Sequence, residues 1–153
     1  MSARMQTQDT NHKEVLRALK VLVVDDISAV RNILCQVIRT LGVEGRIDGA
    51  KDGLEAWEMV QSGDYDMVVC DIRMPRMNGL ELKKLLRATP RLADLPFLMI
   101  TGEVSEEMMA SAVEGELDGY LLKPFPSAAL KKRMLQLLGN NNNNNPARCA
   151  LED

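Results

Sequence analysis

The sequence predicts an α/β fold, a doubly wound αβα sandwich around a five-stranded parallel sheet. Apolar runs of strand length alternate with segments of helical periodicity, and five such pairs follow one another along the chain. Parallel strands need crossover connections, so strict alternation with short loops indicates a parallel sheet. Runs such as VLVV and FLMI are apolar throughout, as expected for strands covered on both faces.

The first part of the chain supplies two strand and helix pairs. KVLVV at 20–24 is an aliphatic, β-branched run of strand length. The segment 29–42 follows with apolar residues at helical spacing, which predicts that one face is buried, made of Val30, Ile33, Leu34, Val37, Ile38 and Leu41. EGRIDGA at 44–50 predicts a weak strand, and glycines bracket a helix at 52–63.

The rest of the chain repeats the alternation three times. The apolar runs predict strands at 65–70, 95–101 and 118–123. The segments between and after them predict helices at 79–89, 105–115 and 127–139. We therefore place one domain at residues 19–139, after a polar extension at 1–18 that could be partly helical. The Asn-rich segment 140–153 is expected to be a disordered tail.

The composition limits the partners. Of 153 residues, 46% are hydrophobic and 27% charged, with a net charge of -3, which gives no basic field for direct binding of nucleic acid. The basic run at 131–133 is expected to be a solvated helix face. No apolar stretch approaches membrane-spanning length and the N-terminus is too polar for a secretory signal, so we expect no membrane partner and a cytoplasmic location.

Cysteine and histidine chemistry is not expected at a functional site. Cys35, Cys70 and Cys149 are an odd number without C-x-x-C spacing, which favours reduced thiols. Strand alternation points Cys70 away from its neighbour Asp71 and into the core. His12 is the only histidine and lies in the polar extension, so no histidine-based metal site or triad is expected.

Polar residues follow four of the expected strands at their carboxyl ends. They are Asp25, Asp26, Asp71, Thr101 and Lys123. In doubly wound sheets ligands bind beyond these ends, near the point where strand order reverses. Converging carboxylates repel one another unless a cation joins them, and a few hard oxygen ligands at an exposed edge favour Mg²⁺. The ammonium and hydroxyl could then contact phosphoryl oxygens, and an aspartate could form an acyl phosphate.

These residues stand in four motifs, VVDD, DIRMPRMNG, LMIT and GYLLKPF, in order and at family-like separations. With them, the stretch 19–139 closely resembles the receiver domain of two-component response regulators, in particular the small single-domain kind used in chemotaxis. The resemblance implies a flavodoxin-like sheet with strand order 2-1-3-4-5. It also implies that the chain is a signalling module and not an enzyme. Such a module catalyses only its own phosphorylation and slow autodephosphorylation.

The resemblance also implies roles for the carboxylates. Asp71 is expected to accept the phosphoryl group from a phosphohistidine on a sensor histidine kinase or phosphotransfer protein. Mg²⁺ is the expected cofactor, held by Asp26 and Asp71, by Asp25 through water and by the backbone carbonyl of Arg73. The competing interpretations are that Asp25 and Asp26 cap the helix after them and that Asp71 is a turn residue.

Lys123 and Thr101 are expected to hold phosphoryl oxygens, and the Lys123–Pro124 bond is similar to one that is cis in the family. Tyr120 matches the family's switch aromatic: a Thr101 drawn to the phosphoryl group vacates space, and a buried position of the ring becomes more populated. Thr101 could instead only end its strand, with Ser105 as the stronger helix cap. Tyr120 could be a half-buried aromatic on an edge strand.

Two further residues are expected to tune the lifetime of the phosphoryl group. Arg73 lies two residues after Asp71, and Glu103 two after Thr101. Paired across the mouth of the site, they would obstruct attacking water and slow the loss of phosphate.

The expected output surface comprises the helix at 105–115, the strand at 118–123 and the helix at 127–139, a face that would bind a downstream protein effector or mediate phosphorylation-dependent dimerisation. Methionines are adaptable at binding surfaces, so Met108 or Met109 could take part. The segment 140–153 is too short for an output domain, so output by protein contact is expected unless the chain is a fragment of a larger regulator.

Two other classes of function compete. A haloacid dehalogenase-like phosphatase or phosphotransferase also uses an aspartyl phosphate, but that class wants a second acid where this chain has Arg73. A receiver-like scaffold that never takes phosphate is the other, and the intact Asp26, Asp71, Thr101 and Lys123 argue against it.

Overall fold

A computed structural model describes residues 11–104, 106–113 and 119–144. Its centre is a five-stranded, wholly parallel sheet in the order β2-β1-β3-β4-β5, so the predicted sheet and strand order are confirmed. The strands are β1 (Val21–Val24), β2 (Ile47–Ala50), β3 (Met67–Asp71), β4 (Phe97–Thr101) and β5 (Tyr120–Leu122). Strand order reverses beside β1, because the chain passes from β1 to β2 on one side and then to β3 on the other.

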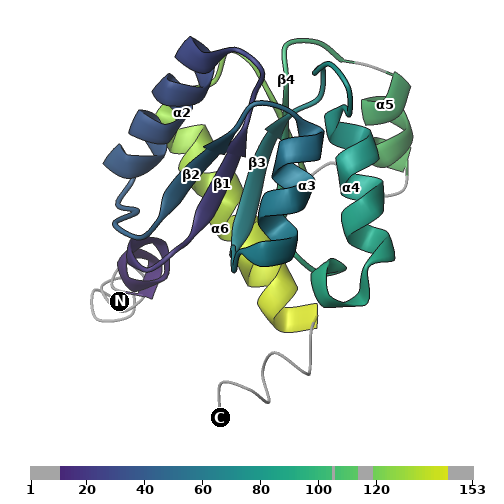
Figure 1. Ribbon diagram of the computed structural model, residues 1–153. Helices are drawn as coiled ribbons and strands as arrows, with labels where there is room; N and C mark the ends of the chain where they lie inside the picture. The colour runs from purple at the N-terminus through teal and green to yellow at the C-terminus, as the bar shows by residue number, and fades with distance from the viewer. Residues whose placement is uncertain (1–10, 105, 114–118, 145–153) are drawn as a thin grey trace.

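Helices cover both faces of the sheet (Figure 1). They are α2 (Ser28–Thr40), α3 (Gly53–Ser62), α4 (Gly79–Ala88), α5 (Glu106–Val113) and α6 (Ser127–Asn144), with a short 3₁₀ helix, η1 (Pro90–Leu92), after α4. Helices α2 and α6 lie on one face, and α3, α4 and α5 lie on the other. Among the described helices, none combines the length and apolar character needed to cross a membrane.

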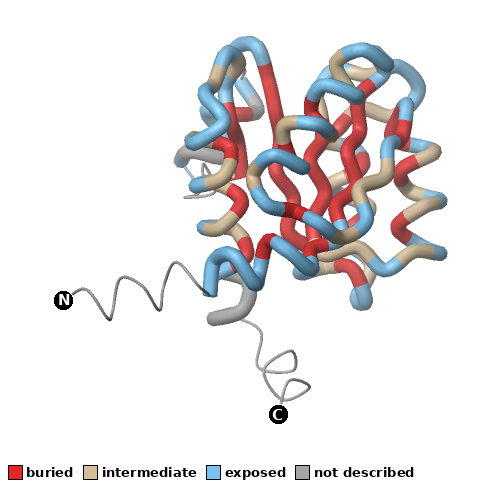
Figure 2. The backbone as a smooth tube through the Cα atoms, turned by 90° about the vertical axis from the view of Figure 1, so that its left-hand side faces the viewer, coloured by how far each residue is buried: buried red, intermediate tan, exposed pale blue. Residues whose placement is uncertain are grey.

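The sheet divides the buried residues into two cores. One lies under α3, α4 and α5 and contains Leu82 and Phe97, while the other lies under α2 and α6 and contains Ile38 and Leu130. Figure 2 shows that the buried positions run along the strands. Cys70 is fully buried in the first core, as strand alternation predicts, and burial raises the pKa of its thiol well above the usual value. Cys70 is therefore a packing residue.

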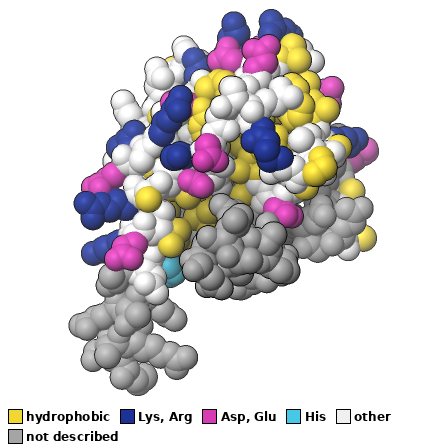
Figure 3. Space-filling view, turned by 60° about the horizontal axis from the view of Figure 1, so that its bottom comes forward, with side chains coloured by type: hydrophobic (Ala, Val, Ile, Leu, Met, Phe, Trp, Pro, Cys, Tyr) yellow, Lys and Arg dark blue, Asp and Glu magenta, His cyan; other side chains and the backbone are white. Residues whose placement is uncertain are grey.

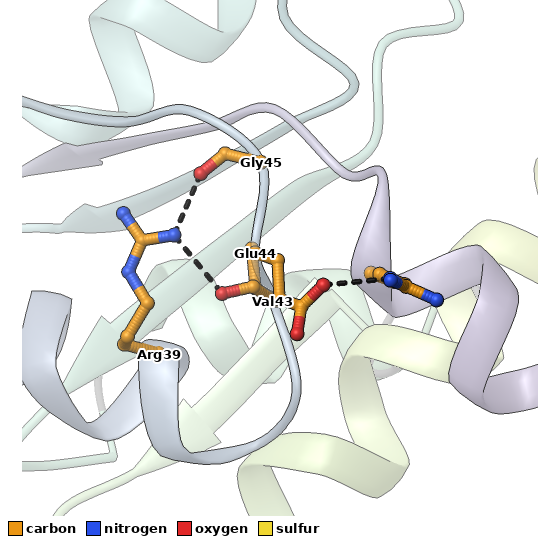
Figure 4. A network of polar contacts seen from close by, with 5 residues as sticks. Arg39, Val43, Glu44 and Gly45 are labelled. Atoms are coloured by element: carbon orange, nitrogen blue, oxygen red, sulfur yellow. Dashed lines mark hydrogen bonds and ion pairs between the residues drawn. The ribbon is translucent and has the colours of Figure 1, made fainter.

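Residues before the predicted domain start at 19 also pack against the core. Residues 11–17 are helical, and Leu16 and Leu19 are buried in the core beneath α2 and α6. The loop after α2 is fixed beside this segment (Figure 4): Arg39 donates hydrogen bonds to the carbonyl oxygens of Val43 at 3.0 Å and Gly45 at 2.7 Å. Glu44 of the same loop forms an ion pair with Arg17 at 2.6 Å.

The bounds of some elements and the buried face of α2 differ from the sequence expectation. Strand β2 is shorter than the expected 44–50. Ile33 is 59% exposed, so the apolar face of α2 is narrower than its periodicity predicts. Helix α6 continues to Asn144 and includes the first residues of the expected tail, since extending an existing helix requires no new nucleation. The remainder of that tail, 145–153, lies outside the described residues.

The amino ends of the strands lie at the edge of the sheet opposite their carboxyl ends. On the face that Figure 3 turns toward the viewer, basic and acidic side chains of the described residues are interspersed. This mixture matches the small net charge of the chain.

Candidate functional site

Three carboxylates meet at the carboxyl ends of β1 and β3. Asp25, Asp26 and Asp71 each offer a ligand oxygen, and these oxygens all lie within 4.8 Å of one another. Because β1 and β3 are adjacent parallel strands, their carboxyl ends bring residues far apart in sequence to one edge. Asp25 is buried, Asp71 half-buried and Asp26 exposed, so the cluster opens to solvent on one side.

The Asp25 carboxylate has one oxygen in use and one without a partner. Its Oδ1 accepts a hydrogen bond from the Ile27 N–H at 2.9 Å. Its Oδ2 is buried and accepts no hydrogen bond from any described group. A buried carboxylate oxygen without a partner is costly, and a nearby cation or a cation-bound water would satisfy it. The donor set therefore fits a hard divalent cation such as Mg²⁺.

The helix-capping interpretation of the first two acids is wrong. Helix α2 begins at Ser28 with Ile27 at its N-cap, and no side chain caps it. The carboxyl end of β1 is fixed instead by the backbone, because the Asp25 N–H donates to Ala50 at 3.1 Å. Arg31 reaches back from α2 and donates to the Asp25 carbonyl oxygen at 2.7 Å. The Asp26 side chain therefore does not cap this helix.

The Asp71 carboxyl group lies between opposing electrostatic influences. Burial raises its pKa above the ordinary value, while the positive charge of Lys123 lowers it. The charge of Asp25 raises the pKa further, and hydrogen bonds from the backbone N–H groups of Arg73 and Ile72 lower it. The Asp71 carboxylate is thus influenced by its own loop and by two charges from other parts of the sheet edge, the Lys123 ammonium and the Asp25 carboxylate.

Thr101 and Lys123 adjoin this cluster from the neighbouring strands. The Lys123 N–H donates to the Thr101 carbonyl oxygen at 2.7 Å, which continues the β4–β5 pairing to the edge of the sheet. The Thr101 side chain is buried, and its Oγ1 donates to the Glu103 carbonyl oxygen at 3.0 Å. The peptide bond between Lys123 and Pro124 is cis. Ser105, the alternative helix cap, lies outside the described residues.

An open depression of about 500 Å³ adjoins the site at Asp26 and Thr101. It is lined by Asp26, Ile72, Arg73, Met74, Pro75, Asn78, Leu80, Thr101 and Glu103. Arg73 and Glu103 form an ion pair across it, with side chains 79% and 54% exposed. The depression is large enough for a small polar group, and its walls come from the loops after β1, β3 and β4.

Several residues that line the depression were not predicted from the sequence. Met74, Asn78 and Leu80 enter the lining because the β3–α4 loop folds over the strand ends. Asn78 also caps α4, accepting from the Glu81 N–H at 2.9 Å while the Glu81 side chain accepts from the Asn78 N–H. The N-x-x-E pattern of a capping box was the available signal for this helix start.

Tyr120 is buried, with 2% of its surface exposed, so the half-buried alternative is wrong. It lies in the core with Met99, its partner on β4, and with side chains of α4. The Lys83 ammonium of α4 lies 5.7 Å from the centre of the Tyr120 ring, a cation–π distance. The buried position of the ring is thus already occupied here, and sequence reasoning did not find Lys83.

The expected output surface exposes several apolar side chains. Met109, Val113 and Leu122 are 60%, 90% and 37% exposed. Met108 is 8% exposed and belongs to the core beneath α5, so of the two methionines considered for partner contact only Met109 is exposed. Neighbouring helix positions point in different directions, and here only Met109 points outward.

Comparison with known proteins decides the family. A model of the response regulator receiver domain matches residues 21–135. The chain belongs to the response regulator receiver domain family. The match begins at the first residue of β1 and ends within α6, so it spans the whole sheet of this receiver domain.

Similar proteins agree with this assignment. Chemotaxis protein CheY-3 of Vibrio cholerae is 42% identical to the receiver domain over 116 residues, 76% of this chain and 88% of the relative. The solved structure of chemotaxis response regulator CheY4 of Vibrio cholerae is 31% identical, with a TM-score of 0.67 over 78% of this chain and 98% of that one. The receiver domain of a sensor histidine kinase from Pseudomonas aeruginosa, solved with magnesium coordinated in its active site cleft, is 23% identical, with a TM-score of 0.69 over 80% and 98% of the two chains. This last likeness concerns the fold.

Proposed function

We propose that this chain is a phosphorylation-switched receiver whose Asp71 accepts a phosphoryl group from a partner's phosphohistidine. The observation that carries the proposal is the half-buried Asp71, which lies beside two further carboxylates and near the charge of Lys123. In the transfer, an Asp71 carboxylate oxygen forms a bond to phosphorus while the phosphorus–nitrogen bond of the phosphohistidine breaks. The imidazole leaves with the bonding electron pair and the product is an aspartyl phosphate.

Mg²⁺ is the proposed cofactor. Asp26 and Asp71 would hold it directly, Asp25 through water, and the Arg73 backbone carbonyl would complete the protein ligands. The buried, unpartnered Oδ2 of Asp25 supports this donor set. When bound, the cation offsets the negative charge that gathers on the phosphoryl oxygens. The magnesium in the cleft of the Pseudomonas aeruginosa receiver domain agrees with this choice of metal.

The chain's own residues would orient the phosphoryl group. Lys123 supplies a positive charge near Asp71, and its influence on the Asp71 pKa supports that placement. The Thr101 hydroxyl would exchange its bond to the Glu103 carbonyl for one to a phosphoryl oxygen. This exchange would move Thr101 toward Asp71 and enlarge the space that the Tyr120 ring can use. The ring is buried before any such movement, so phosphorylation would stabilise an existing position.

The proposed output is binding of a protein effector by the surface of α5, β5 and α6, where Met109, Val113 and Leu122 are exposed. Apolar side chains that remain exposed on a folded surface favour protein contact. Phosphorylation-dependent dimerisation through the same surface is the second candidate. The CheY relatives support a role of this kind in chemotaxis signalling.

The deciding experiment is intact mass spectrometry with Trp57 fluorescence, during titration with Mg²⁺ and acetyl phosphate. We expect a Mg²⁺-dependent gain of one phosphoryl group that is lost in Asp71→Asn, and a saturable fluorescence change with Mg²⁺ and beryllofluoride. Folded protein that gains no adduct and does not respond to Mg²⁺ would favour the scaffold reading. An adduct that persists in Asp71→Asn would place the acceptor elsewhere.

A further inference from the structure

The loop between β3 and α4 contains a backbone conformation that residues with a Cβ rarely adopt. Arg76 has φ 67°, the only positive φ of a non-glycine residue within the described part of the chain. Such a conformation is unfavourable for a long side chain and persists where surrounding contacts hold it. At Arg76 that contact is an ion pair, 3.2 Å from its Nε to Oδ2 of Asp52.

Asp52 is well placed to anchor this arginine. It is 4% exposed and stands at the N-cap of α3, where its Oδ1 accepts from the Glu55 N–H at 2.9 Å. Its two oxygens are therefore divided between a helix and the loop. A buried carboxylate held by its own helix cap offers Arg76 a fixed partner, unlike an exposed pair whose two side chains both move.

A second contact adjoins the ion pair. The Gly53 N–H donates to the Met77 carbonyl oxygen at 3.2 Å, and a Cβ at Gly53 would lie only 2.5 Å from that oxygen. Two consecutive loop residues, Arg76 and Met77, are thus fastened to two consecutive residues at the start of α3. These contacts fix the tip of the loop.

The base of the loop is closed separately. The Gly79 N–H donates to the Ile72 carbonyl oxygen at 2.9 Å. Between base and tip lies Arg73, whose backbone lies close enough to the Asp71 carboxylate to lower its pKa. A loop fixed only at its base could pivot, and Arg73 would move with it. Fixing the tip removes this freedom.

We propose that the Asp52–Arg76 ion pair positions the β3–α4 loop for cation binding, so that Arg76 and Asp52 act on the metal site through the Arg73 backbone. Neither residue touches the carboxylate cluster, so both are positioning residues. The inference rests on the proposed function in that it takes the Arg73 carbonyl as a Mg²⁺ ligand.

Charge gives this inference a clear test. Replacing Arg76 with a neutral residue removes a positive charge near an acidic site, and electrostatics alone would then strengthen Mg²⁺ binding. Loss of positioning would weaken it. The two explanations therefore differ in sign for the same variant. Arg76→Gly is the most suitable change, because glycine adopts positive φ without strain and leaves the loop backbone free to keep its fold.

The experiment is calorimetric titration of the full chain with MgCl₂ alone, for wild type, Arg76→Gly, Asp52→Asn and the double variant. We expect Arg76→Gly to raise the Mg²⁺ dissociation constant about tenfold, at the lower end of the effects of outer-shell residues on metal affinity. Asn can still cap α3 through its amide oxygen, so Asp52→Asn should bind Mg²⁺ similarly weakly. The double variant should be no weaker than Arg76→Gly, since both changes break one interaction.

Arg17→Ala is the matched control. It also removes an arginine from an ion pair with an acid, but Arg17 and Glu44 precede β1 and β2 at the opposite edge of the sheet. Its Mg²⁺ dissociation constant should equal that of wild type. Arg76→Asn, whose side chain also tolerates positive φ, repeats the test if Arg76→Gly is poorly folded.

Unchanged or tighter Mg²⁺ binding by folded Arg76→Gly would overturn the positioning role. A wild-type chain that does not bind Mg²⁺ would instead overturn the metal site of the proposed function. Additive effects of the two changes on Mg²⁺ binding in the double variant would also count against the pair. Additivity would mean that Arg76 and Asp52 act independently.

Discussion

Arg73 and Glu103 form an ion pair that bridges the loops after β3 and β4, and both line the depression that Asp26 also lines. Each stands two residues beyond a residue proposed to contact the phosphoryl group. The pair is largely exposed, so its own stability is modest. From this position we expect the pair to obstruct water that approaches an aspartyl phosphate.

Breaking this pair should shorten the lifetime of the phosphoryl group. We expect Arg73→Ala and Glu103→Ala each to accelerate autodephosphorylation by about 1.4-fold to fivefold, since an exposed pair contributes about 0.2–1 kcal/mol and that is the barrier it can add. The measurement is loss of the phosphoryl mass adduct after removal of the donor. The double variant should match the faster single variant. Lifetimes that do not change would remove the pair from control of hydrolysis.

Thr101→Val should separate phosphorylation from the response of Tyr120. Valine keeps the branched shape but cannot donate the hydrogen bond that Thr101 now makes to Glu103. We expect the variant to gain the phosphoryl group on Asp71 but to leave the Tyr120 ring unaffected. The chain has two tyrosines, so fluorotyrosine NMR gives two signals, and Tyr65→Phe assigns them. Thr101→Ser should respond as wild type does. If the Tyr120 NMR signal of phosphorylated Thr101→Val shifted as far as that of wild type, the proposed coupling between Thr101 and Tyr120 would be contradicted.

Gly79→Ala should destabilise the domain. An added Cβ would lie 2.6 Å from the Asp71 carbonyl oxygen and 2.7 Å from the Met99 sulfur, so the start of α4 would have to move. Overpacking of this kind costs about 1–3 kcal/mol. The control is Gly139→Ala in α6, where the new Cβ meets open space and helix propensity should stabilise the fold by about 0.5–1 kcal/mol. Urea unfolding measures both. Equal stability of Gly79→Ala and wild type would mean that the loop base is more adaptable than this packing indicates.

Asp71→Asn should stabilise the metal-free fold at neutral pH. Burial raises the pKa of Asp71 in the folded state, so the folded chain holds this proton more tightly than the unfolded chain does. The ionised carboxylate is therefore a penalty above the folded pKa, and the penalty fades as the pH falls from the folded toward the unfolded value. Because the group is only half-buried, we expect the Tm of Asp71→Asn to exceed that of wild type by about 1–2 °C.

This difference should shrink as the medium is acidified, because wild type then becomes neutral at residue 71 in both states. Thermal unfolding at several pH values with a chelator present tests the sign. A lower Tm for Asp71→Asn at neutral pH would show that the bonds from Ile72 and Arg73 outweigh the cost of burying the charge.

The periodicity of the sequence was sufficient to predict the sheet and the location of the site. Strand-length apolar runs in alternation with helical segments admit a parallel sheet, and parallel strands bring their carboxyl ends to one edge. The convergence of Asp25, Asp26 and Asp71 follows from that geometry. The family resemblance supplied the strand order, which local pattern does not contain.

Tertiary packing decided which side chains of an apolar face are buried. The helical pattern placed Ile33 and Leu34 on one face of α2, yet the cover that α2 receives buries only Leu34. Neighbouring methionines could not be ranked from sequence, and the seating of α5 buries Met108 while Met109 remains exposed. Periodicity shows which residues share a face, whereas burial depends on which other elements lie against that face.

What the sequence by itself determined is the order of strands and helices along the chain and the acids that meet at the sheet edge, because both follow from local periodicity and parallel pairing. What only the tertiary structure decided is how the site is held: the buried seat of Tyr120 beside Lys83, and the bond from Arg76 to Asp52. These contacts join residues of different elements, which no helical or strand periodicity relates to one another. They arise from the packing of helices and loops against a finished sheet, so no single stretch of sequence encodes them.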